Sequence, residues 1–288
     1  MSRCVLPFIS FDYQYVSPCC KLQKYNDLTD RNKLINDHKA NIKSKFCTSC
    51  WQTEGTGVES KRQSYNKLYS KYKNINERNL KHLVIPVGNV CNLACVTCGP
   101  FASTGWIKKS QFMQRDDVDV KVIQGIKNVE QQKLDNVEHI EFIGGETLKS
   151  ASFWNYLKTF PKHINFSIQT NGTIILDKNQ IDLLNSFENF NICFSIDGYG
   201  KIFEYLRQPA KWDSTVRNLK KYVQHFGLNK LSYLITISNL NILYIDKIVM
   251  ELYKAVPCKF DFTLVDSPDI FAIDNLTPNI GKIIEQNN

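Results

Sequence analysis

The stretch of sequence that decides the fold reads His82-Leu-Val-Ile-Pro-Val-Gly-Asn-Val-Cys91-Asn-Leu-Ala-Cys95-Val-Thr-Cys98. The apolar run predicts a buried β-strand over 82–88, and the cysteines then lie in the loop at its carboxyl end. Active sites of parallel barrels lie in such loops. Three thiolates spaced C-x3-C-x2-C can hold three irons of a cubane cluster and leave the fourth iron open to a ligand. A three-thiolate zinc site is the alternative, although structural zinc usually prefers two C-x2-C pairs.

Outward from this stretch, β-rich runs alternate with helical patterns. We expect strands at 82–88, 137–143, 164–170, 190–196, 231–237 and 259–265, and helices near 116–134, 151–159, 177–187, 213–225 and 243–255. This alternation predicts right-handed βαβ units and a parallel sheet. In three of the runs apolar residues alternate with polar ones, whereas a sheet covered by helices on both faces would be apolar on both. We therefore expect an α/β fold, a partial (β/α)6 TIM-like barrel with a polar lumen.

Composition narrows the class of protein. The 288 residues are 43% hydrophobic, which supports a sizeable core. No run of 18 apolar residues and no signal-peptide pattern occur, so we expect a cytoplasmic protein without a membrane partner. Ten cysteines in a reducing compartment indicate metal ligands or redox groups rather than disulfides. The formal net charge of +8 fits an acidic partner or a nucleic acid without identifying either.

Three segments are expected along the chain. Residues 1–60 are cysteine-rich and lack long apolar periods, so we predict an irregular segment that needs a metal to hold its shape. Residues 61–81 are basic and carry tyrosines at helical spacing, which predicts a helical connector packed on the barrel, with RNA binding as the alternative. Residues 82–288 form the barrel. The five histidines are scattered, so no histidine metal site is predicted.

The cysteine loop is similar to the signature of the radical S-adenosylmethionine (SAM) superfamily. Gly144-Gly145-Glu146, after the second strand, looks like that family's Gly-Gly-Glu motif, which binds the amino group of SAM. The resemblance implies a [4Fe–4S] cluster on Cys91, Cys95 and Cys98, with SAM at its open iron. Two glycines would let the backbone approach the ligand, and the carboxylate would pair with the ammonium.

Polar residues at the ends of the third and fourth strands resemble the family's contacts to the ribose or carboxylate of SAM; they are Asn171, Ser195 and Asp197. Arg207 lies in a Tyr–Arg–Trp stretch similar to one in twitch-type relatives. It can pair with a carboxylate of SAM or substrate, or form a structural ion pair. Cys193 is expected to face the lumen as a hydrogen-atom donor or as a small buried filler.

The N-terminal cysteines resemble a SPASM or twitch subdomain. A closer resemblance is to twitch-type radical SAM proteins, in which a block like Cys50-Trp51…Glu54…Gly57…Ser60…Arg62…Asn66 leads into the barrel. This similarity implies an auxiliary [4Fe–4S] cluster on Cys4, Cys19, Cys47 and Cys50, with Cys20 spare or exchanging with Cys19. A four-cysteine zinc site is the alternative.

The resemblance implies an enzyme that reductively cleaves SAM to a 5′-deoxyadenosyl radical, which abstracts hydrogen from a substrate. A peptide or protein side chain is the favoured substrate, a small metabolite or an RNA is the alternative, and a flavodoxin or ferredoxin is the expected reductant. A non-catalytic iron–sulfur or zinc module is the competing class. The Gly-Gly-Glu motif and the polar strand ends favour the enzyme.

Overall fold

The computed structural model describes residues 3–12, 18–19, 22, 28–55, 57, 59–72, 74–75, 77, 79–112, 122–123, 125, 134, 136–265 and 268–273. The chain divides into two compact units. The first consists of Met1–Pro86 and Asn128–Glu141, and the second of Val87–Lys127 and Phe142–Asn288. No helix in the described part of the chain is long and apolar enough to cross a membrane.

Seven strands neighbour one another in chain order. They are β1 (Ser10–Asp12), β2 (His82–Pro86), β3 (His139–Ile143), β4 (Asn165–Thr170), β5 (Phe190–Ser195), β6 (Leu231–Ile237) and β7 (Lys259–Leu264). The pairs β1–β2, β4–β5, β5–β6 and β6–β7 are parallel. Six strands lie within two residues of their predicted bounds, which confirms the α/β fold with a parallel sheet. The strand β1 was not predicted, because three residues are too few to show an alternation.

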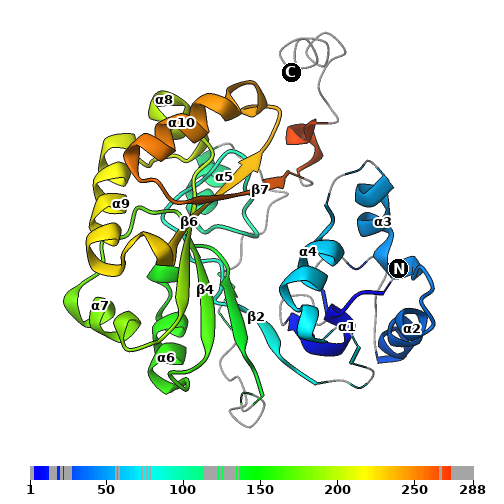
Figure 1. Ribbon diagram of the computed structural model, residues 1–288. Coiled ribbons are helices and arrows are strands. Elements are labelled where there is room, and N and C mark those ends of the chain that lie inside the picture. The colour runs from blue at the N-terminus through cyan, green and yellow to red at the C-terminus, as the bar shows by residue number, and fades with distance from the viewer. Residues whose placement is uncertain are drawn as a thin grey trace. The chain divides into compact units, whose positions relative to one another are not determined.

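Ten α-helices lie among the described residues. They are α1 (Leu6–Ile9), α2 (Leu28–Lys39), α3 (Thr48–Gly55), α4 (Lys61–Leu68), α5 (Gly105–Phe112), α6 (Ala151–Thr159), α7 (Lys178–Asn185), α8 (Gly200–Leu206), α9 (Trp212–Phe226) and α10 (Ile245–Ala255). Helices α6, α7, α9 and α10 were predicted, and they lie along one side of strands β4–β6 (Figure 1). The helix expected near 116–134 falls almost wholly outside the described residues.

Strands β4 and β5 of the second unit have one buried and one more exposed face. In β5 the residues Phe190, Ile192 and Phe194 are buried, whereas the residues between them are half-buried. Strand β4 alternates in the same way. This confirms the apolar and polar faces that the sequence predicts. Strand β7 differs, because Phe262 and Leu264 on its apolar side remain 51% exposed.

Helix α9 shows how the sequence specifies the helical layer. Its buried residues Thr215, Asn218, Leu219, Tyr222 and Phe226 recur every three or four positions, so they share one face. Gly227 ends the helix with a φ of +76°, a conformation that glycine adopts without steric cost.

The described parts of residues 1–60 are largely helical, and the prediction of an irregular segment there is wrong. Helices α1, α2 and α3 occupy much of this range. Leu34 of α2 packs against Phe46 and Cys47 in one small cluster, and Phe8 of α1 packs with Tyr69 in another. Because each short helix contributes so few apolar side chains, the sequence shows no clear helical period.

Phe142 tests the core of the second unit. Its side chain is fully buried, and its ring lies 5.0–6.4 Å from those of Phe153, Tyr156, Phe160 and Phe166. We expect Phe142→Ala to lower the free energy of unfolding by about 3–5 kcal/mol, because it leaves a cavity. Urea denaturation measures this loss. Ile175→Ala, at a side chain that is 66% exposed, is the matched control and should change stability by less than about 0.5 kcal/mol. Equal urea midpoints for the two variants would contradict the placement of Phe142 in the core of the second unit.

Candidate functional site

The cysteine loop that follows β2 is fixed by hydrogen bonds within the second unit. The backbone N–H groups of Ala94 and Val96 donate to the carbonyls of Gln208 and Leu206, at 2.7 and 2.8 Å. The indole Nε1 of Trp106 donates to the Cys95 carbonyl at 3.1 Å. The loop therefore lies along the segment that follows α8.

Cys95 and Cys98 are close enough to interact directly. A hydrogen bond between their thiols raises the pKa of Cys95 and lowers that of Cys98. Nη1 of Arg207 lies 3.9 Å from the Cys95 sulfur. A guanidinium beside these sulfurs favours their thiolate forms, which are the forms that bind metal.

Cys91 completes the set of three cysteines. Burial raises the pKa of its thiol. Its sulfur is approached by two N–H donors, the backbone N of Leu93 at 3.4 Å and Nδ2 of Asn171 at 3.9 Å. Hydrogen bonds to sulfur are one way in which a protein sets the potential of an iron–sulfur cluster.

Arg207 forms a buried ion pair. Its Nη2 lies 2.6 Å from Oδ2 of Asp197, and both side chains are at most 10% exposed. Burial by itself would lower the pKa of Arg207, but Asp197 and the nearby cysteines outweigh it and raise that pKa. The Nε of Arg207 is buried and has no hydrogen-bond partner among the residues that the structure describes. Arg207 thus has a structural ion pair and retains one N–H for a ligand.

The glycine pair after β3 allows two backbones to meet. The N–H groups of Gly145 and Glu146 donate to the carbonyls of Gly88 and Val90, both at 2.8 Å. A Cβ on Gly144 would lie 2.3 Å from the Gly88 carbonyl oxygen, and one on Gly145 would lie 2.5 Å from that of Val90. These glycines are required for the contact between the loops after β2 and β3.

Glu146 joins a third loop to these two. Its carboxylate accepts hydrogen bonds from Thr170 Oγ1, the backbone N of Asn171 and the backbone N of Leu148, at 2.7, 2.7 and 3.1 Å. The side chain is buried, and burial raises its pKa while these hydrogen bonds act against the rise. Three protein donors already satisfy this carboxylate, so its evident role is to position the end of β4. Binding of an ammonium by Glu146 stays a prediction.

The structure brings most of the predicted residues of this site together. Asn171 reaches Cys91, Arg207 reaches Cys95, and Asp197 reaches Arg207. Ser195 and Cys193 lie on the half-buried face of β5. The sequence did not point to Asn92 and Thr173. Asn171 donates to Asn92 Oδ1 at 3.0 Å, and Asn92 donates to Thr173 Oγ1 at 2.8 Å. Asn92 and Thr173 line a cavity of about 230 Å³ that reaches the start of α9.

The four predicted N-terminal ligands line one small cavity in the first unit. Cys4, Cys19, Cys47 and Cys50 border about 20 Å³ of space together with Arg62. Burial raises the pKa of Cys4 to about 12 and also raises that of Cys47. A metal must displace their protons to bind. Cys20 lies outside the described residues.

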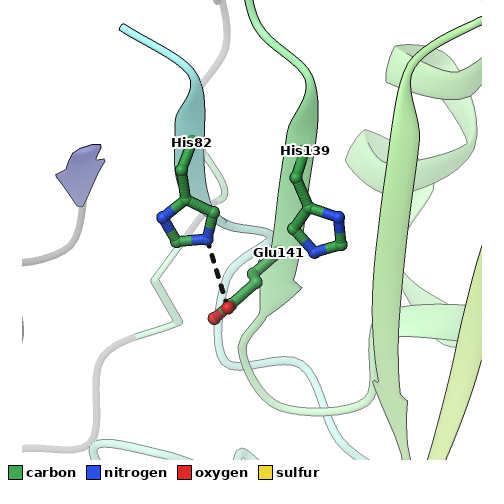
Figure 2. Close-up of side chains that lie close together, drawn as sticks. All are labelled: His82, His139 and Glu141. Carbon is green, nitrogen blue, oxygen red and sulfur yellow. Dashed lines mark ion pairs between the residues drawn. The ribbon is translucent and has the colours of Figure 1, made fainter. Parts of the chain in front are cut away.

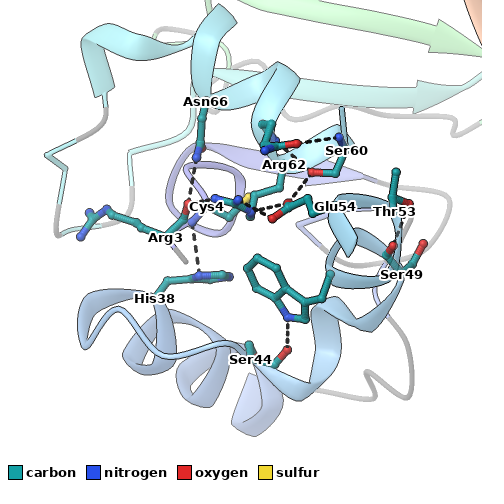
Figure 3. Close-up of polar contacts among 12 residues, drawn as sticks. Arg3, Cys4, His38, Ser44, Ser49, Thr53, Glu54, Ser60, Arg62 and Asn66 are labelled. Carbon is teal, nitrogen blue, oxygen red and sulfur yellow. Dashed lines mark hydrogen bonds and ion pairs between the residues drawn. The ribbon is translucent and has the colours of Figure 1, made fainter. Parts of the chain in front are cut away.

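A polar clamp formed by Glu54, Ser60, Arg62 and Asn66 fixes the backbone on both sides of Cys4 (Figure 3). Arg62 pairs with both carboxylate oxygens of Glu54, at 2.8 and 2.7 Å. Arg62 and Asn66 both donate to the Arg3 carbonyl, and Asn66 Oδ1 accepts from the Val5 N–H. Arg62 and Asn66, which belong to the block that resembles twitch-type proteins, therefore hold the Arg3–Val5 backbone some 60 positions earlier in the sequence.

His38 is a component of this site that sequence reasoning missed. Its ring is fully buried, Nδ1 accepts from the Cys4 N–H at 3.2 Å, and Nε2 lies 3.6 Å from the Cys47 sulfur (Figure 3). Because Nδ1 accepts a hydrogen bond, the network assigns the proton of the neutral ring to Nε2. His38 therefore donates toward the sulfur. A single histidine in a polar helix gave no signal in the sequence.

The histidines also depart from the sequence prediction at a second place. His82 on β2 and His139 on β3 stack with ring centroids 5.7 Å apart, and Glu141 lies beside them (Figure 2). The prediction that no histidines cluster is wrong. Parallel strands brought residues 57 positions apart into contact, which a linear reading does not reveal.

Gly145 tests the contact between the loops after β2 and β3. We expect Gly145→Ala to cost about 1–3 kcal/mol in stability, because the new methyl group would overlap the Val90 carbonyl. Thermal unfolding measures this. Gly55→Ala is the matched control, since a Cβ there meets nothing within 4 Å. If Gly145→Ala unfolds no more easily than Gly55→Ala, the backbone contact is absent in solution.

Asn66 tests the clamp on Cys4. We expect Asn66→Ala to increase the rate of Cys4 alkylation in the metal-free protein about tenfold, because two partly buried hydrogen bonds to the Arg3–Val5 backbone are lost. Mass spectrometry of the labelled peptide gives the rate. Lys67→Ala, on a side chain that is 75% exposed, should leave the rate unchanged. Equal rates for the two variants would show that Asn66 does not hold Cys4.

Comparison with known proteins places this geometry in context. No family model matches the chain. The uncharacterised protein MJ0907 of Methanocaldococcus jannaschii is 27% identical over 191 residues, which are 60% of this chain and 58% of that protein. SuiB of Streptococcus suis bound to its precursor peptide SuiA superposes with a TM-score of 0.52 at 15% identity, over 83% of this chain and 59% of that one.

A further structure, anSMEcpe with bound S-adenosylmethionine, gives a TM-score of 0.49 at 21% identity, over 66% of this chain and 51% of that one. The chain thus spans between half and three fifths of the length of these proteins. The likeness to SuiB is one of fold, and the chain shares the α/β fold of that protein.

Proposed function

We propose that this chain is a radical SAM enzyme with a [4Fe–4S] cluster on Cys91, Cys95 and Cys98. The observation that carries the proposal is the convergence of three cysteines in one loop, with N–H donors directed at two of the sulfurs. When bound, the cluster and SAM supply the electron and the 5′-deoxyadenosyl radical that abstracts hydrogen from substrate. The residues of the chain hold these groups and exclude water.

The protein groups around the loop suit such a cluster. Three thiolates leave one iron without a protein ligand. The positive charge of Arg207 lies beside Cys95 and offsets the negative charge of the thiolates. The unpartnered Nε of Arg207 is a buried donor for a carboxylate of SAM or substrate. Glu146 keeps Asn171 in reach of Cys91 by accepting its backbone N–H.

We propose a peptide or protein side chain as the substrate. SuiB, which shares the fold, was crystallised with its precursor peptide. The half-buried polar face of β4 and β5 offers side chains such as Cys193 and Ser195 for contacts with a bound substrate. The reductant in this proposal is a flavodoxin or a ferredoxin.

We also propose that Cys4, Cys19, Cys47 and Cys50 hold an auxiliary [4Fe–4S] cluster. All four border one cavity, and the clamp of Glu54, Arg62 and Asn66 fixes Cys4 among them. Four thiolates also suit zinc. Metal analysis decides between the two.

Anaerobic reconstitution tests both proposals. We expect about eight irons per chain for two cubane clusters, and release of 5′-deoxyadenosine from SAM after reduction. Cys91→Ala should abolish that release, because it removes a ligand of the cluster that reduces SAM. Cys258→Ala, at a buried cysteine just before β7 and outside both cysteine groups, is the matched control and should behave like the wild type.

The outcomes separate the two metal sites. Four irons and one zinc with zinc–sulfur distances of about 2.3 Å per chain, with 5′-deoxyadenosine released, would support the catalytic cluster and replace the auxiliary cluster by zinc. Protein that contains only zinc and releases no 5′-deoxyadenosine would contradict the enzyme proposal and favour a binding module.

A further inference from the structure

His82, His139 and Glu141 form a group of metal-ligating side chains in the first unit that contains no cysteine (Figure 2). One ligand atom from each lies within 4.8 Å of the other two. A tetrahedral zinc ion with bonds of about 2.0–2.1 Å holds its ligand atoms about 3.4 Å apart. Small side-chain rotations are therefore enough to close the group around one ion.

The Nε2 atom of His82 is the observation that points to a ligand. His82 is 1% exposed, and its Nε2 forms an ion pair of 3.1 Å with Oε1 of Glu141 but has no well-aligned hydrogen bond among the described residues. In the tautomer with the proton on Nδ1, the Nε2 lone pair and the Glu141 carboxylate oxygen are two acceptors 3.1 Å apart, which is costly in a buried site. A cation between the nitrogen and the oxygen removes this cost.

Hydrogen bonds from outside the group already orient two of its members. The other ring nitrogen of His82, Nδ1, lies 2.8 Å from Ser10 Oγ, and the hydroxyl of Tyr65 donates to Glu141. Burial and the charge of Glu141 raise the pKa of Tyr65 well above its usual value, so this hydroxyl stays a donor. Supporting hydrogen bonds of this kind orient the ligands of most protein metal sites.

We propose that His82, His139 and Glu141 bind one zinc ion, which ties the start of β2 to the start of β3 within the first unit. Two imidazoles and a carboxylate are a donor set that zinc favours among divalent ions. The Glu141 side chain is 23% exposed, so water has access to the fourth coordination position. The site is independent of the cysteines, and its test does not require the chain to be an enzyme.

The test is zinc binding to the full chain after its iron–sulfur clusters have been reconstituted. We expect one further zinc per chain, bound with zinc–nitrogen or zinc–oxygen distances of about 2.0–2.1 Å and without the zinc–sulfur distance of about 2.3 Å, by X-ray absorption at the zinc edge. Zinc should also raise the Tm. His139→Gln should weaken binding by about 100-fold and remove the Tm shift, because one ligand is lost.

Tyr65→Phe keeps the ring but removes the hydrogen bond to Glu141, and we expect it to weaken zinc binding about tenfold. His163→Gln, at an exposed histidine, is the matched control and should bind zinc like the wild type. No zinc beyond that bound by sulfur, or equal affinity in all four proteins, would overturn the proposal. If His139→Gln does not fold, Tyr65→Phe and the wild-type absorption spectrum decide the question.

Discussion

The site in the second unit depends on a contact between two backbones. The loop after β3 lies so close to the loop after β2 that a Cβ at Gly144 or Gly145 would overlap a carbonyl oxygen. Two N–H groups that would otherwise need water are satisfied across this contact. Glu146 follows at once, and its carboxylate receives the backbone N–H of Asn171. The absence of side chains at Gly144 and Gly145 therefore lets the loops after β2, β3 and β4 meet, and it places Asn171 beside Cys91.

In the first unit, side chains rather than glycines fix the position of a cysteine. Cys4 is held by the ion pair of Arg62 with Glu54 and by the side-chain amide of Asn66. Arg62 and Glu54 are 8% and 17% exposed, so removal of either partner would leave a largely buried charge without compensation. Both donors on the Arg3 carbonyl come from α4, which begins with the capping box of Ser60 and Gln63. The backbone beside Cys4 is thus held by one well-capped helix some 60 positions later in the sequence.

Sequence reasoning worked where the signal is local. The alternation in β4 and β5 and the long apolar face of α9 each lie within a few turns or residues of chain, and the structure has them in place. The approach of a ligand to Gly144 and Gly145 stays a prediction, and sequence reasoning missed the second backbone that the structure places against them. It missed His38 and the pairing of His82 with His139, because these depend on contacts between distant segments. Sequence reasoning left open whether Arg207 forms an ion pair. The structure shows that it does, with Asp197.

The first unit is discontinuous, because residues 128–141 return to it after the cysteine loop. A fragment ending at residue 86 would contain every N-terminal cysteine yet lack Glu138 and Glu141, which accept the hydroxyls of Tyr72 and Tyr65. A gene fusion that transfers only residues 1–86 would therefore separate the cysteine-rich segment from part of its own unit. Any exchange between related proteins, in the laboratory or in evolution, has to carry the returning stretch with it.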